Sequence, residues 1–412
     1  MKTPHIVIVG AGFAGIYTHQ YLRRYFAGNS AEITIISRQN YFLFTPMLHE
    51  VATGSLAHHQ VAESLREIIK KDETNLVVGE VEKIDLDIKK VYVAGKGIPY
   101  DYLVLATGAV TNFFGTPGAE ENALVLKDLR DAIVLRNKFI DVFEKASLEE
   151  DVKVRRRLLS FAVVGGGATG VEIATEMADF FFGTFRRLYK GVIQKSDISL
   201  SLVTQSAELL TPMHKFLQEK ALKVLKQKGI KVLLNAKVKE VRKDSIAIEG
   251  ADDIYAENIV WAAGVKAQYP ELAGNVIPDK SGRLPVKASL QLEGYENVFV
   301  LGDIALFLQD GKPLPMLAQV AADQAPIAAE NIALLQKGKK LRRFYYSSRG
   351  ELVSLGKYNA VARVFNINFY GFFAWFLWRT IYLFKFLSGS KRMKIAADWT
   401  VDLFYPRDIT RA

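Results

Sequence analysis

The chain contains no cysteine among its 412 residues. This absence excludes structural disulfides, cysteine-ligated metal or iron–sulfur centres and a redox-active dithiol. Only six histidines are present, and their spacing does not suit a metal site, so we predict no bound metal. Any redox chemistry must therefore be that of a bound organic cofactor.

A long uncharged apolar run is also lacking. The aromatic stretch over residues 366–387 is interrupted at Arg379, and its uncharged part is shorter than the ~20 residues that a spanning helix needs. No basic segment or cleavage site precedes the apolar run that begins at Ile6, so we expect no secretory leader and a cytoplasmic start.

Acidic residues are scarce at the C-terminal end. The net charge is +10, and the last 72 residues hold twelve Lys or Arg against four Asp or Glu. The same segment contains 18 of the 46 aromatic residues. Such a segment suits an anionic lipid surface better than a nucleic acid, so we predict a lipid partner and no nucleic-acid partner.

A strand followed by a glycine motif and a helical pattern occurs twice. The runs 5–10 and 161–165 each lead into such a motif, and 33–36 and 198–204 are spaced as the next strands. The two motifs are GAGFAG at 10–15 and GGGATG at 165–170, both of the form G-x-G-x-x-G. The glycines permit a tight turn and let a pyrophosphate approach the backbone at a helix N-terminus. We therefore predict an α/β fold with two Rossmann-like dinucleotide-binding domains, one for FAD and one for NAD(P)H.

Longer segments resemble one flavoprotein family. The chain is similar to the type II NADH:quinone oxidoreductases, a group of two-dinucleotide-binding-domain flavoproteins, over nearly its whole length. The segments that carry the resemblance are NYFLFTPML at 40–48, VATG at 51–54, YDYLVLATG at 100–108, GGGATGVE at 165–172, VFVLGD at 298–303 and AQVA at 318–321. Residues 398–411 resemble the C-terminal end of mitochondrial-type members.

The resemblance places FAD in the first domain. The cofactor-binding residues expected there are Gly10, Gly12, Phe13, Ala14, Gly15, Ser37, Arg38, Val81, Thr107, Gly108, Gly302, Asp303, Ala318 and Gln319. The three motif glycines would hold the pyrophosphate, and Asp303 would bind the ribityl or pyrophosphate side. Ser37 and Arg38 would lie near the ribose, and the backbone of Val81 near the adenine. Position 37 is serine where an acid would grip the ribose with a charge-assisted bond, so we expect weaker ribose binding.

The second domain would hold NADH or NADPH as substrate. The residues expected to contact it are Gly165, Gly167, Gly170, Gln205 and Gly264. Gln205 stands at the end of the second strand of this unit, where a strictly NADH-using member would carry glutamate. A glutamate there repels a 2′-phosphate, whereas glutamine does not, so NADPH becomes admissible. The alternative is that Gln205 is a turn residue one position out of register.

Three residues are predicted to be catalytic: Glu172, Gln319 and Asp323. By resemblance, Glu172 would lie where nicotinamide and flavin meet and would position the nicotinamide or relay a proton; otherwise it only favours a helix N-terminus electrostatically. Gln319 would lie beside the isoalloxazine on the quinone-site helix. Asp323 stands where the family usually has a second glutamine, and facing the pocket it would exchange a proton with the quinone. The alternative for this helix is packing against the flavin domain.

The aromatic C-terminal region is predicted to be a membrane-surface helical segment. Its tryptophans and tyrosines, Tyr370, Trp375, Trp378 and Tyr382, suit the membrane interface. Its cations, Arg379, Lys385, Lys391, Arg392 and Lys394, would reach lipid phosphates. The alternative partner for this surface is a second copy of the chain, in a homodimer.

The expected domains are an FAD-binding domain of residues 1–118 and 266–338, an NAD(P)H-binding domain of residues 119–265 and a membrane-association region of residues 339–412. The resemblance implies a non-proton-pumping respiratory enzyme that passes hydride from NADH or NADPH to FAD and two electrons to a membrane quinone. It would be a peripheral protein on the cytoplasmic side of the inner (cell) membrane. Two alternatives stay open: a soluble-type NAD(P)H oxidase, and a non-catalytic flavin-binding sensor or scaffold. Sulfide:quinone and disulfide reductases of the same fold are excluded, because they need cysteine.

Overall fold

The computed structural model describes residues 3–28, 30–69 and 74–411. Residues 1–2, 29, 70–73 and 412, which the predicted domain ranges include, lie outside the described residues. The chain forms two compact units, each assembled from segments far apart in sequence. Unit 1 comprises Met1–Leu43, Glu63–Val110 and Val265–Ser347, and unit 2 comprises Phe44–Ala62, Thr111–Gly264 and Ser348–Ala412.

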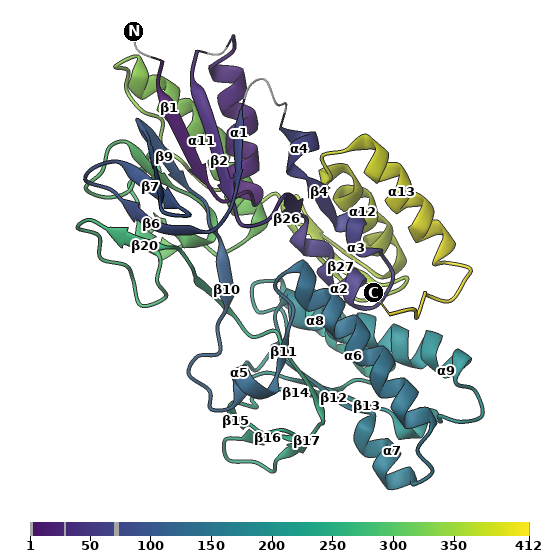
Figure 1. The fold of residues 1–412 in the computed structure, drawn as a ribbon. Helices are drawn as coiled ribbons and strands as arrows, with labels where there is room; N and C mark the ends of the chain where they lie inside the picture. The colour runs from purple at the N-terminus through teal and green to yellow at the C-terminus, as the bar shows by residue number, and fades with distance from the viewer. Residues whose placement is uncertain (1–2, 29, 70–73, 412) are drawn as a thin grey trace. The chain divides into compact units, whose positions relative to one another are not determined.

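Unit 1 is built on a parallel five-stranded sheet of order β22-β9-β1-β2-β5. Its strands are β1 (His5–Val9), β2 (Glu32–Ser37), β5 (Asn75–Val78), β9 (Tyr102–Leu105) and β22 (Val298–Val300). The central strand β1 is almost wholly apolar and buried, as expected of a parallel strand covered on both faces. The helices α1 (Phe13–Tyr25) and α11 (Ala318–Gln336) lie side by side in this unit (Figure 1).

The rest of unit 1 consists of short elements. A four-stranded sheet of order β20-β6-β7-β8 contains β6 (Val81–Asp85), β7 (Lys90–Val93), β8 (Lys96–Pro99) and β20 (Glu271–Ala273). The remaining elements are β3 (Tyr41–Leu43), α4 (Leu65–Ile68), β19 (Val265–Ala267), β21 (Leu284–Pro285), η4 (Gly302–Ile304), β23 (Ala305–Leu306), β24 (Leu308–Gln309) and β25 (Lys312–Pro313). Two strands, β4 (Ala62–Ser64) and β10 (Ala109–Thr111), run across the boundary between the units.

Unit 2 repeats the topology of unit 1. Its parallel sheet has the order β11-β18-β12-β13-β14, with β11 (Leu124–Val125), β12 (Ser160–Val164), β13 (Ser199–Val203), β14 (Lys231–Leu233) and β18 (Asn258–Trp261). In both sheets the strand before the glycine motif is central, because β1 pairs with β2 and β9 just as β12 pairs with β13 and β18. The predicted duplication of a Rossmann-like α/β unit is therefore confirmed.

The sheet of unit 2 is surrounded by helices and a small antiparallel sheet. The helical elements are α5 (Ala119–Asn122), α6 (Leu129–Ser147), α7 (Val152–Leu158), α8 (Ala168–Asp179), the π-helical turn η2 (Phe180–Phe185), α9 (Arg186–Leu188), η3 (Lys195–Asp197) and α10 (Lys215–Gln227). The strands β15 (Val238–Val241), β16 (Ser245–Ile248) and β17 (Ile254–Tyr255) form the small sheet. The segment 44–62 contributes η1 (Thr45–Met47), α2 (Leu48–Ala52) and α3 (His58–Val61) to the same unit.

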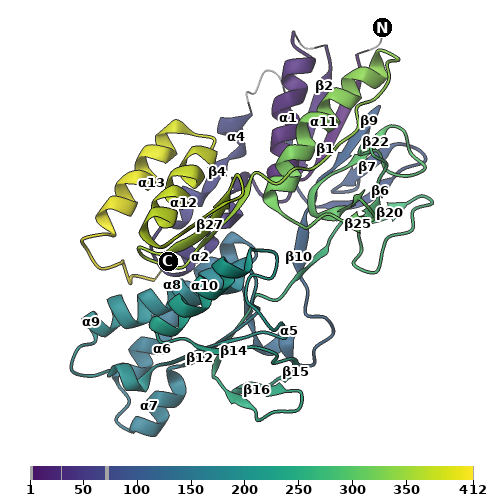
Figure 2. The same cartoon turned by 180° about the vertical axis from the view of Figure 1, so that it is seen from behind.

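The C-terminal residues are integral to unit 2. They form the antiparallel sheet β26 (Gly350–Ser354), β27 (Ala360–Val364) and β28 (Ile367–Tyr370), followed by α12 (Gly371–Lys385) and α13 (Gly389–Val401). In this unit β26 contacts α8, and α10 contacts β14 as well as β27 and β28 (Figure 2). The compact units thus follow other boundaries than the three predicted domains, because segments 44–62 and 348–412 both pack with the second Rossmann-like fold.

One face of α12 packs inward. Trp375 and Trp378 are only 5% and 1% exposed, so they do not form the lipid-facing surface expected from the sequence. Arg379 is also turned inward, because it stacks on Trp375 and Trp399 at 4.1 and 4.9 Å and donates to the Trp399 carbonyl. The prediction that Arg379 reaches lipid phosphates is therefore wrong, and the aromatic rings around it are the reason. Within the described ranges, no helix is both long and apolar enough to cross a bilayer.

Candidate functional site

The glycine loop of unit 1 has three glycines with three different environments. Gly10 adopts a φ of +105°, and a Cβ there would lie 2.3 Å from the Ala106 carbonyl oxygen. A Cβ on Gly15 would lie 1.9 Å from the Gly10 carbonyl oxygen, so close packing of α1 on the loop demands glycine. A Cβ on Gly12 would meet no protein atom within 4 Å, although this residue is the N-cap of α1.

The glycine loop of unit 2 has the same geometry. Gly165 has a φ of +128°, and a Cβ there would lie 2.7 Å from the Ala262 carbonyl oxygen. A Cβ on Gly170 would clash with the Gly165 carbonyl oxygen at 1.9 Å. Gly167, the N-cap of α8, again leaves open space, and no side chain caps either helix. The two loops fit dinucleotides, because the middle glycine of each leaves room for a pyrophosphate beside free helix N–H groups.

Other predicted FAD contacts lie in unit 1, several of them just after strands of the same sheet. Thr107 and Gly108 follow β9, and Gly302 and Asp303 begin η4, which is separated from the end of β22 by one residue. Ser37 is the last residue of β2 and is partly buried, Arg38 is exposed, and Val81 begins β6. Ligands of doubly wound sheets bind outside the carboxyl ends of the strands, so the positions after β2, β9 and β22 suit the predicted role.

The start of α11 carries the predicted quinone-site residues. Ala318 and Gln319 form its first turn, and the Gln319 Nε2 donor is buried with no hydrogen-bond partner among the described residues. A buried donor of this kind costs free energy unless a ligand or water satisfies it, so Gln319 is suited to contact a bound group. Asp323 is half-buried one turn further along.

The glutamine that follows Asp323 has a structural role. Gln324 is 1% exposed, and its Oε1 accepts a hydrogen bond of 2.6 Å from the Gly302 backbone N–H. Gly302 adopts a φ of +72° and lies against Ala321 and Ala14, so Gln324 fixes the η4 turn from α11. Gln324 was not among the site residues predicted from the sequence, where a glutamine within an alanine-rich helix was the available signal.

Gln205 and Gly264 lie at the carboxyl edge of the unit 2 sheet. Gln205 is exposed two residues after the end of β13, and Gly264 follows β18 with a φ of +87°. The segment containing Gln205 folds over the glycine loop, because the Leu210 N–H donates to the Gly166 carbonyl at 2.8 Å. This edge is where the adenosine ribose binds in dinucleotide folds, which suits the predicted role of Gln205.

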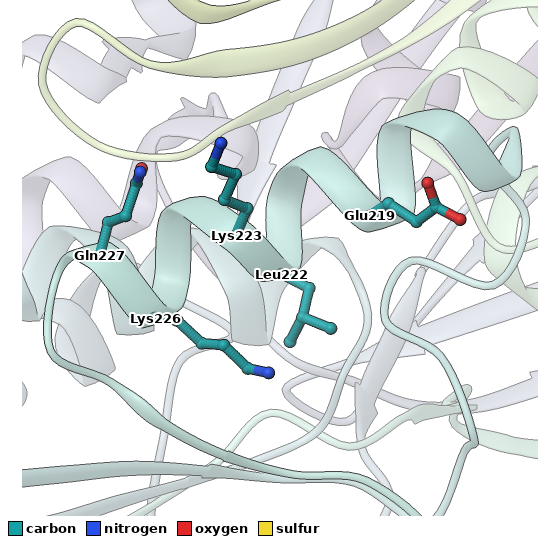
Figure 3. Close-up of a pocket in the computed structure, with 5 residues that line it drawn as sticks. All are labelled: Glu219, Leu222, Lys223, Lys226 and Gln227. Carbon is teal, nitrogen blue, oxygen red and sulfur yellow. The ribbon is translucent and has the colours of Figure 1, made fainter.

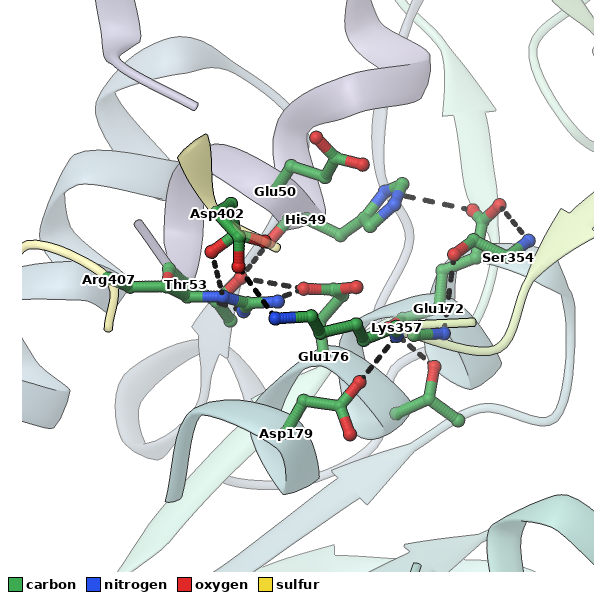
Figure 4. A network of polar contacts seen from close by, with 12 residues as sticks. His49, Glu50, Thr53, Glu172, Glu176, Asp179, Ser354, Lys357, Asp402 and Arg407 are labelled. Carbon is green, nitrogen blue, oxygen red and sulfur yellow. Dashed lines mark hydrogen bonds and ion pairs between the residues drawn. The ribbon is translucent and has the colours of Figure 1, made fainter. Parts of the chain in front are cut away.

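Glu172 lies in the second turn of α8, inside unit 2. Its Oε1 accepts a hydrogen bond of 3.1 Å from the Ser354 backbone N–H, and its Oε2 lies 3.9 Å from His49 Nδ1 (Figure 4). Burial raises the pKa of Glu172 to about 8, although the Ser354 N–H opposes the shift. Glu172 is therefore held protonated near neutrality and can donate a proton. The reading in which it only favours the helix terminus does not explain this burial.

A set of buried and partly buried ionisable residues lies around Glu172, and we call it the buried charge cluster. Its members are His49, Glu50, Glu172, Glu176, Asp179, Lys228, Lys357, Arg379, Asp402 and Arg407. Arg407 is 5% exposed at its side chain and pairs with Glu176 at 2.8 Å and Asp402 at 3.4 Å. Asp179 pairs with Lys228 and accepts from the Lys357 backbone N–H. Most of these members are drawn in Figure 4.

Glu50 and His49 enter the cluster from α2. Glu50 accepts a 2.6 Å hydrogen bond from the Trp399 indole, and burial raises its pKa to about 7 against the nearby charge of Arg379. Burial lowers the pKa of His49 to about 4, so its ring is neutral near neutrality. Neither residue was predicted from the sequence, although the segments on either side of them, 40–48 and 51–54, carry the family resemblance. The signal was present at α8, where Glu172 and Glu176 stand four residues apart in an apolar run.

The structure assigns the predicted residues to two separate groups. The first glycine loop, η4, Gln319 and Asp323 belong to unit 1, whereas the second glycine loop, Gln205 and Glu172 belong to unit 2. A shallow hollow of about 460 Å³ also lies along α10 (Figure 3). Glu219, Leu222, Lys223, Lys226 and Gln227 line it, all from this one helix, so no convergent set of polar groups favours a ligand there.

Comparison with known proteins identifies the family. The family model for pyridine nucleotide-disulphide oxidoreductases matches residues 4–325, and that for the NDH2 C-terminal domain matches residues 349–408. The type II NADH:quinone oxidoreductase Ndh of Mycobacterium tuberculosis is 31% identical over 418 residues, which cover 98% of this chain and 88% of that protein. The chain belongs to the type II NADH:quinone oxidoreductases. A probable NADH dehydrogenase of Dictyostelium discoideum is 32% identical over 423 residues, covering 100% of this chain and 92% of its own.

Solved structures agree with this type II fold. The structure of NDH2 from Plasmodium falciparum in complex with NADH superposes with a TM-score of 0.90 at 22% identity, covering 99% of this chain and 100% of that one. The sulfide:quinone oxidoreductase from Aquifex aeolicus reaches 0.76 at 20% identity, with 98% and 96% covered. The predicted family, fold class, flavin-dependent NADH dehydrogenase activity and quinone acceptor are confirmed, as are FAD as cofactor and NADH as substrate. The individual site residues stay predictions.

Proposed function

We propose that this type II NADH:quinone oxidoreductase binds FAD at the glycine loop of unit 1 and NADH at the glycine loop of unit 2. The observation that carries the proposal is the repeated geometry of the two loops, in which Gly12 and Gly167 leave open space beside uncapped helix N-termini. Bound FAD would supply the redox chemistry, by accepting hydride from NADH and giving two electrons to the quinone.

The residues of the chain would bind and orient the flavin and the quinone and would supply protons to the quinone. The orphaned Gln319 Nε2 would donate a hydrogen bond to the flavin or quinone at the start of α11. Glu172, protonated near neutrality, would supply a proton to quinone reduction, since a quinol carries two protons more than the quinone. Asp323 would be a second proton-exchanging group.

Steady-state turnover tests this function. Purified, FAD-loaded protein is given NADH or NADPH under anaerobic conditions, with and without a short-chain quinone. Quinone-dependent oxidation of the donor is the expected result. Oxidation that requires oxygen would favour the oxidase, and flavin that is reduced once without turnover would favour the sensor or scaffold. The ratio of kcat/KM for NADH to kcat/KM for NADPH reports the role of Gln205.

We further propose that the exposed face of α12 rests on the anionic surface of the cell membrane, on its cytoplasmic side. Phe372, Phe373, Phe376 and Phe384 are between 58% and 66% exposed, whereas Trp375 and Trp378 of the same helix are buried. Exposed aromatic side chains gathered on one helix are costly in water, and lipid would cover them. The exposed Lys394 of α13 would add attraction to anionic headgroups.

Substitutions on this face test membrane attachment better than truncation, because residues after Gly338 include strands and helices of the unit 2 fold. The double variant Phe373→Ser/Phe376→Ser should bind vesicles of phosphatidylcholine and phosphatidylglycerol at least tenfold more weakly, since each buried Phe contributes roughly 1.5–3 kcal/mol. The matched control is Leu148→Ser, which changes an 85% exposed side chain after α6. Unchanged vesicle binding with loss of a dimer would support the homodimer alternative instead.

A further inference from the structure

The buried charge cluster has more carboxylates than cations. Its carboxylates are Glu50, Glu172, Glu176, Asp179 and Asp402, and its permanent cations are Lys228, Lys357, Arg379 and Arg407. A buried, uncompensated charge is too costly to persist, so a cluster with one excess carboxylate retains a proton near neutrality. The location of that proton follows from the individual contacts.

Glu172 is the carboxylate that has no cation beside it. Glu176 and Asp402 pair with Arg407, and Asp179 pairs with Lys228. Glu50 accepts from the Trp399 indole and feels the charge of Arg379. The Glu172 carboxylate accepts from the Ser354 N–H and faces the His49 ring, and no Lys or Arg pairs with it among the described residues. The excess proton therefore resides chiefly on Glu172.

His49 is placed to exchange that proton. Its side chain is 4% exposed, and Nδ1 faces the Glu172 Oε2 at 3.9 Å, about 1 Å beyond hydrogen-bond length. Its other nitrogen, Nε2, is buried with no hydrogen-bond partner in the part of the chain that the structure describes. A neutral imidazole carries one donor and one acceptor nitrogen, so a ring with one nitrogen toward an acid and the other unengaged can pass a proton through.

A permanent His49–Glu172 ion pair is the competing explanation. It would require two charges to form in the same buried space, where burial disfavours both the imidazolium and the carboxylate. The other groups that act on the pair do not reverse this preference. Glu50 from α2 and Glu176 from α8 disfavour ionisation of Glu172. The charge of Glu176 favours protonation of His49, but burial, with a smaller contribution from the Arg407 charge, outweighs it. Tyr382 of α12, itself affected by Glu172, is held neutral by burial.

We propose that His49 reloads Glu172 with protons during quinone reduction. After Glu172 has given up its proton, His49 Nδ1–H donates to the carboxylate, so that the N–H bond breaks and an O–H bond forms. Nε2 accepts a replacement proton from a water molecule admitted to the buried site, which leaves the ring as the Nε2–H tautomer. The first tautomer returns when Nε2 gives its proton back to water and Nδ1 takes one up. No electrons move in this step. The proposal rests on the proton-donating role proposed for Glu172.

Infrared titration distinguishes failure of the proton-donating role of Glu172 from failure of the relay through His49. The C=O stretch of protonated Glu172, identified by its loss in Glu172→Gln, should titrate near pH 8 in the FAD-loaded protein. If no such band exists, the role of Glu172 fails and that of His49 with it. In His49→Asn the band should persist, because burial rather than His49 keeps Glu172 protonated.

Kinetics then tests His49 itself. His49→Asn retains an amide N–H near the Nδ1 position but cannot pass a proton through. With the infrared band intact, quinone reduction should slow at least tenfold, show a larger solvent isotope effect and partly recover with added imidazole. A wild-type rate and isotope effect would overturn the proposal.

A measurement on the unaltered protein covers the case in which the variant does not fold. With ¹⁵N-labelled histidine, the His49 ring should be neutral at pH 7. An imidazolium at that pH would establish a static ion pair and would also overturn the relay.

Discussion

Replacing Arg407 with methionine removes a buried cation and leaves the carboxylates that surround it. The Arg407 guanidinium lies 2.8 Å from Glu176 and 3.4 Å from Asp402, and the exposed fractions of the three side chains are 5%, 4% and 9%. The Thr53 hydroxyl also donates to Glu176, at 3.2 Å. Methionine keeps much of the side-chain volume but none of the charge.

The expected cost is about 3–5 kcal/mol in the free energy of unfolding of unit 2, the range for breaking a buried ion pair from one side. The chain offers a matched control four residues further on. Arg411 pairs with Asp141 at 2.5 Å, but the two side chains are 63% and 38% exposed. Arg411→Met should therefore cost less than about 1 kcal/mol.

The stability lost in Arg407→Met should also depend on pH. Burial raises the pKa of Glu176, but the charge and hydrogen bond of Arg407, together with the charges of His49 and Lys228, outweigh it, so the pKa lies below its ordinary value of 4.5. The stabilisation from this pair is present above pH 4.5 and is lost as the pH falls through the lowered pKa. In Arg407→Met the effect of burial is no longer overcome, so Glu176 takes up a proton at higher pH. The difference between wild type and variant should shrink on acidification.

Hydrogen exchange of the α8 amides measures this free energy without requiring the two units to unfold together. Equal stability of Arg407→Met and wild type at pH 7, or a difference that does not change between pH 7 and pH 4, would refute the reasoning. Equal losses in Arg407→Met and Arg411→Met would show that burial of the pair does not matter.

Three other predictions concern the glycine loop, Glu172 and Gln205. Gly15→Ala should lower the free energy of unfolding by at least about 2 kcal/mol, because the added Cβ clashes with the Gly10 carbonyl. Gly12→Ala should change the free energy of unfolding of the FAD-free protein by under about 0.5 kcal/mol but weaken FAD binding. Thermal unfolding and FAD retention measure both, and a Gly12→Ala protein that binds FAD like wild type would contradict the assignment. The raised pKa of Glu172 means that its stability contribution is lost as the pH rises from 4.5 to about 8, by up to about 5 kcal/mol. Glu172→Gln should therefore gain stability relative to wild type over this window, and a constant difference in urea unfolding would count against the shift. Gln205→Glu should lower NADPH turnover at least tenfold relative to NADH, as measured by kcat/KM for both donors, and an unchanged ratio would support the turn-residue alternative.

Local patterns in the sequence were sufficient for the duplicated fold. The predicted strand at 33–36 lies within β2, the predicted strand at 198–204 contains β13, and the helix expected to carry Gln319 is α11. Glycine at positions 10, 15, 165 and 170 is demanded by contacts within the same strand–turn–helix unit or with the next strand of its sheet. Such constraints can be read from spacing, because the turn geometry is the same in every loop of this type.

The sequence alone determined two Rossmann-like units, their glycine loops, the absence of cysteine chemistry and an aromatic, basic C-terminal region. Only the tertiary structure decided which aromatic residues of α12 face inward, that Gln324 rather than Asp323 fixes η4, and that His49 and Arg407 come to lie around α8. The physical reason is that burial and charge pairing depend on neighbours more than a hundred residues away, on α2 and at the C-terminus. The sequence pattern of α8 contains two acids in an apolar helix, but their protonation is set by the side chains that the fold packs against them.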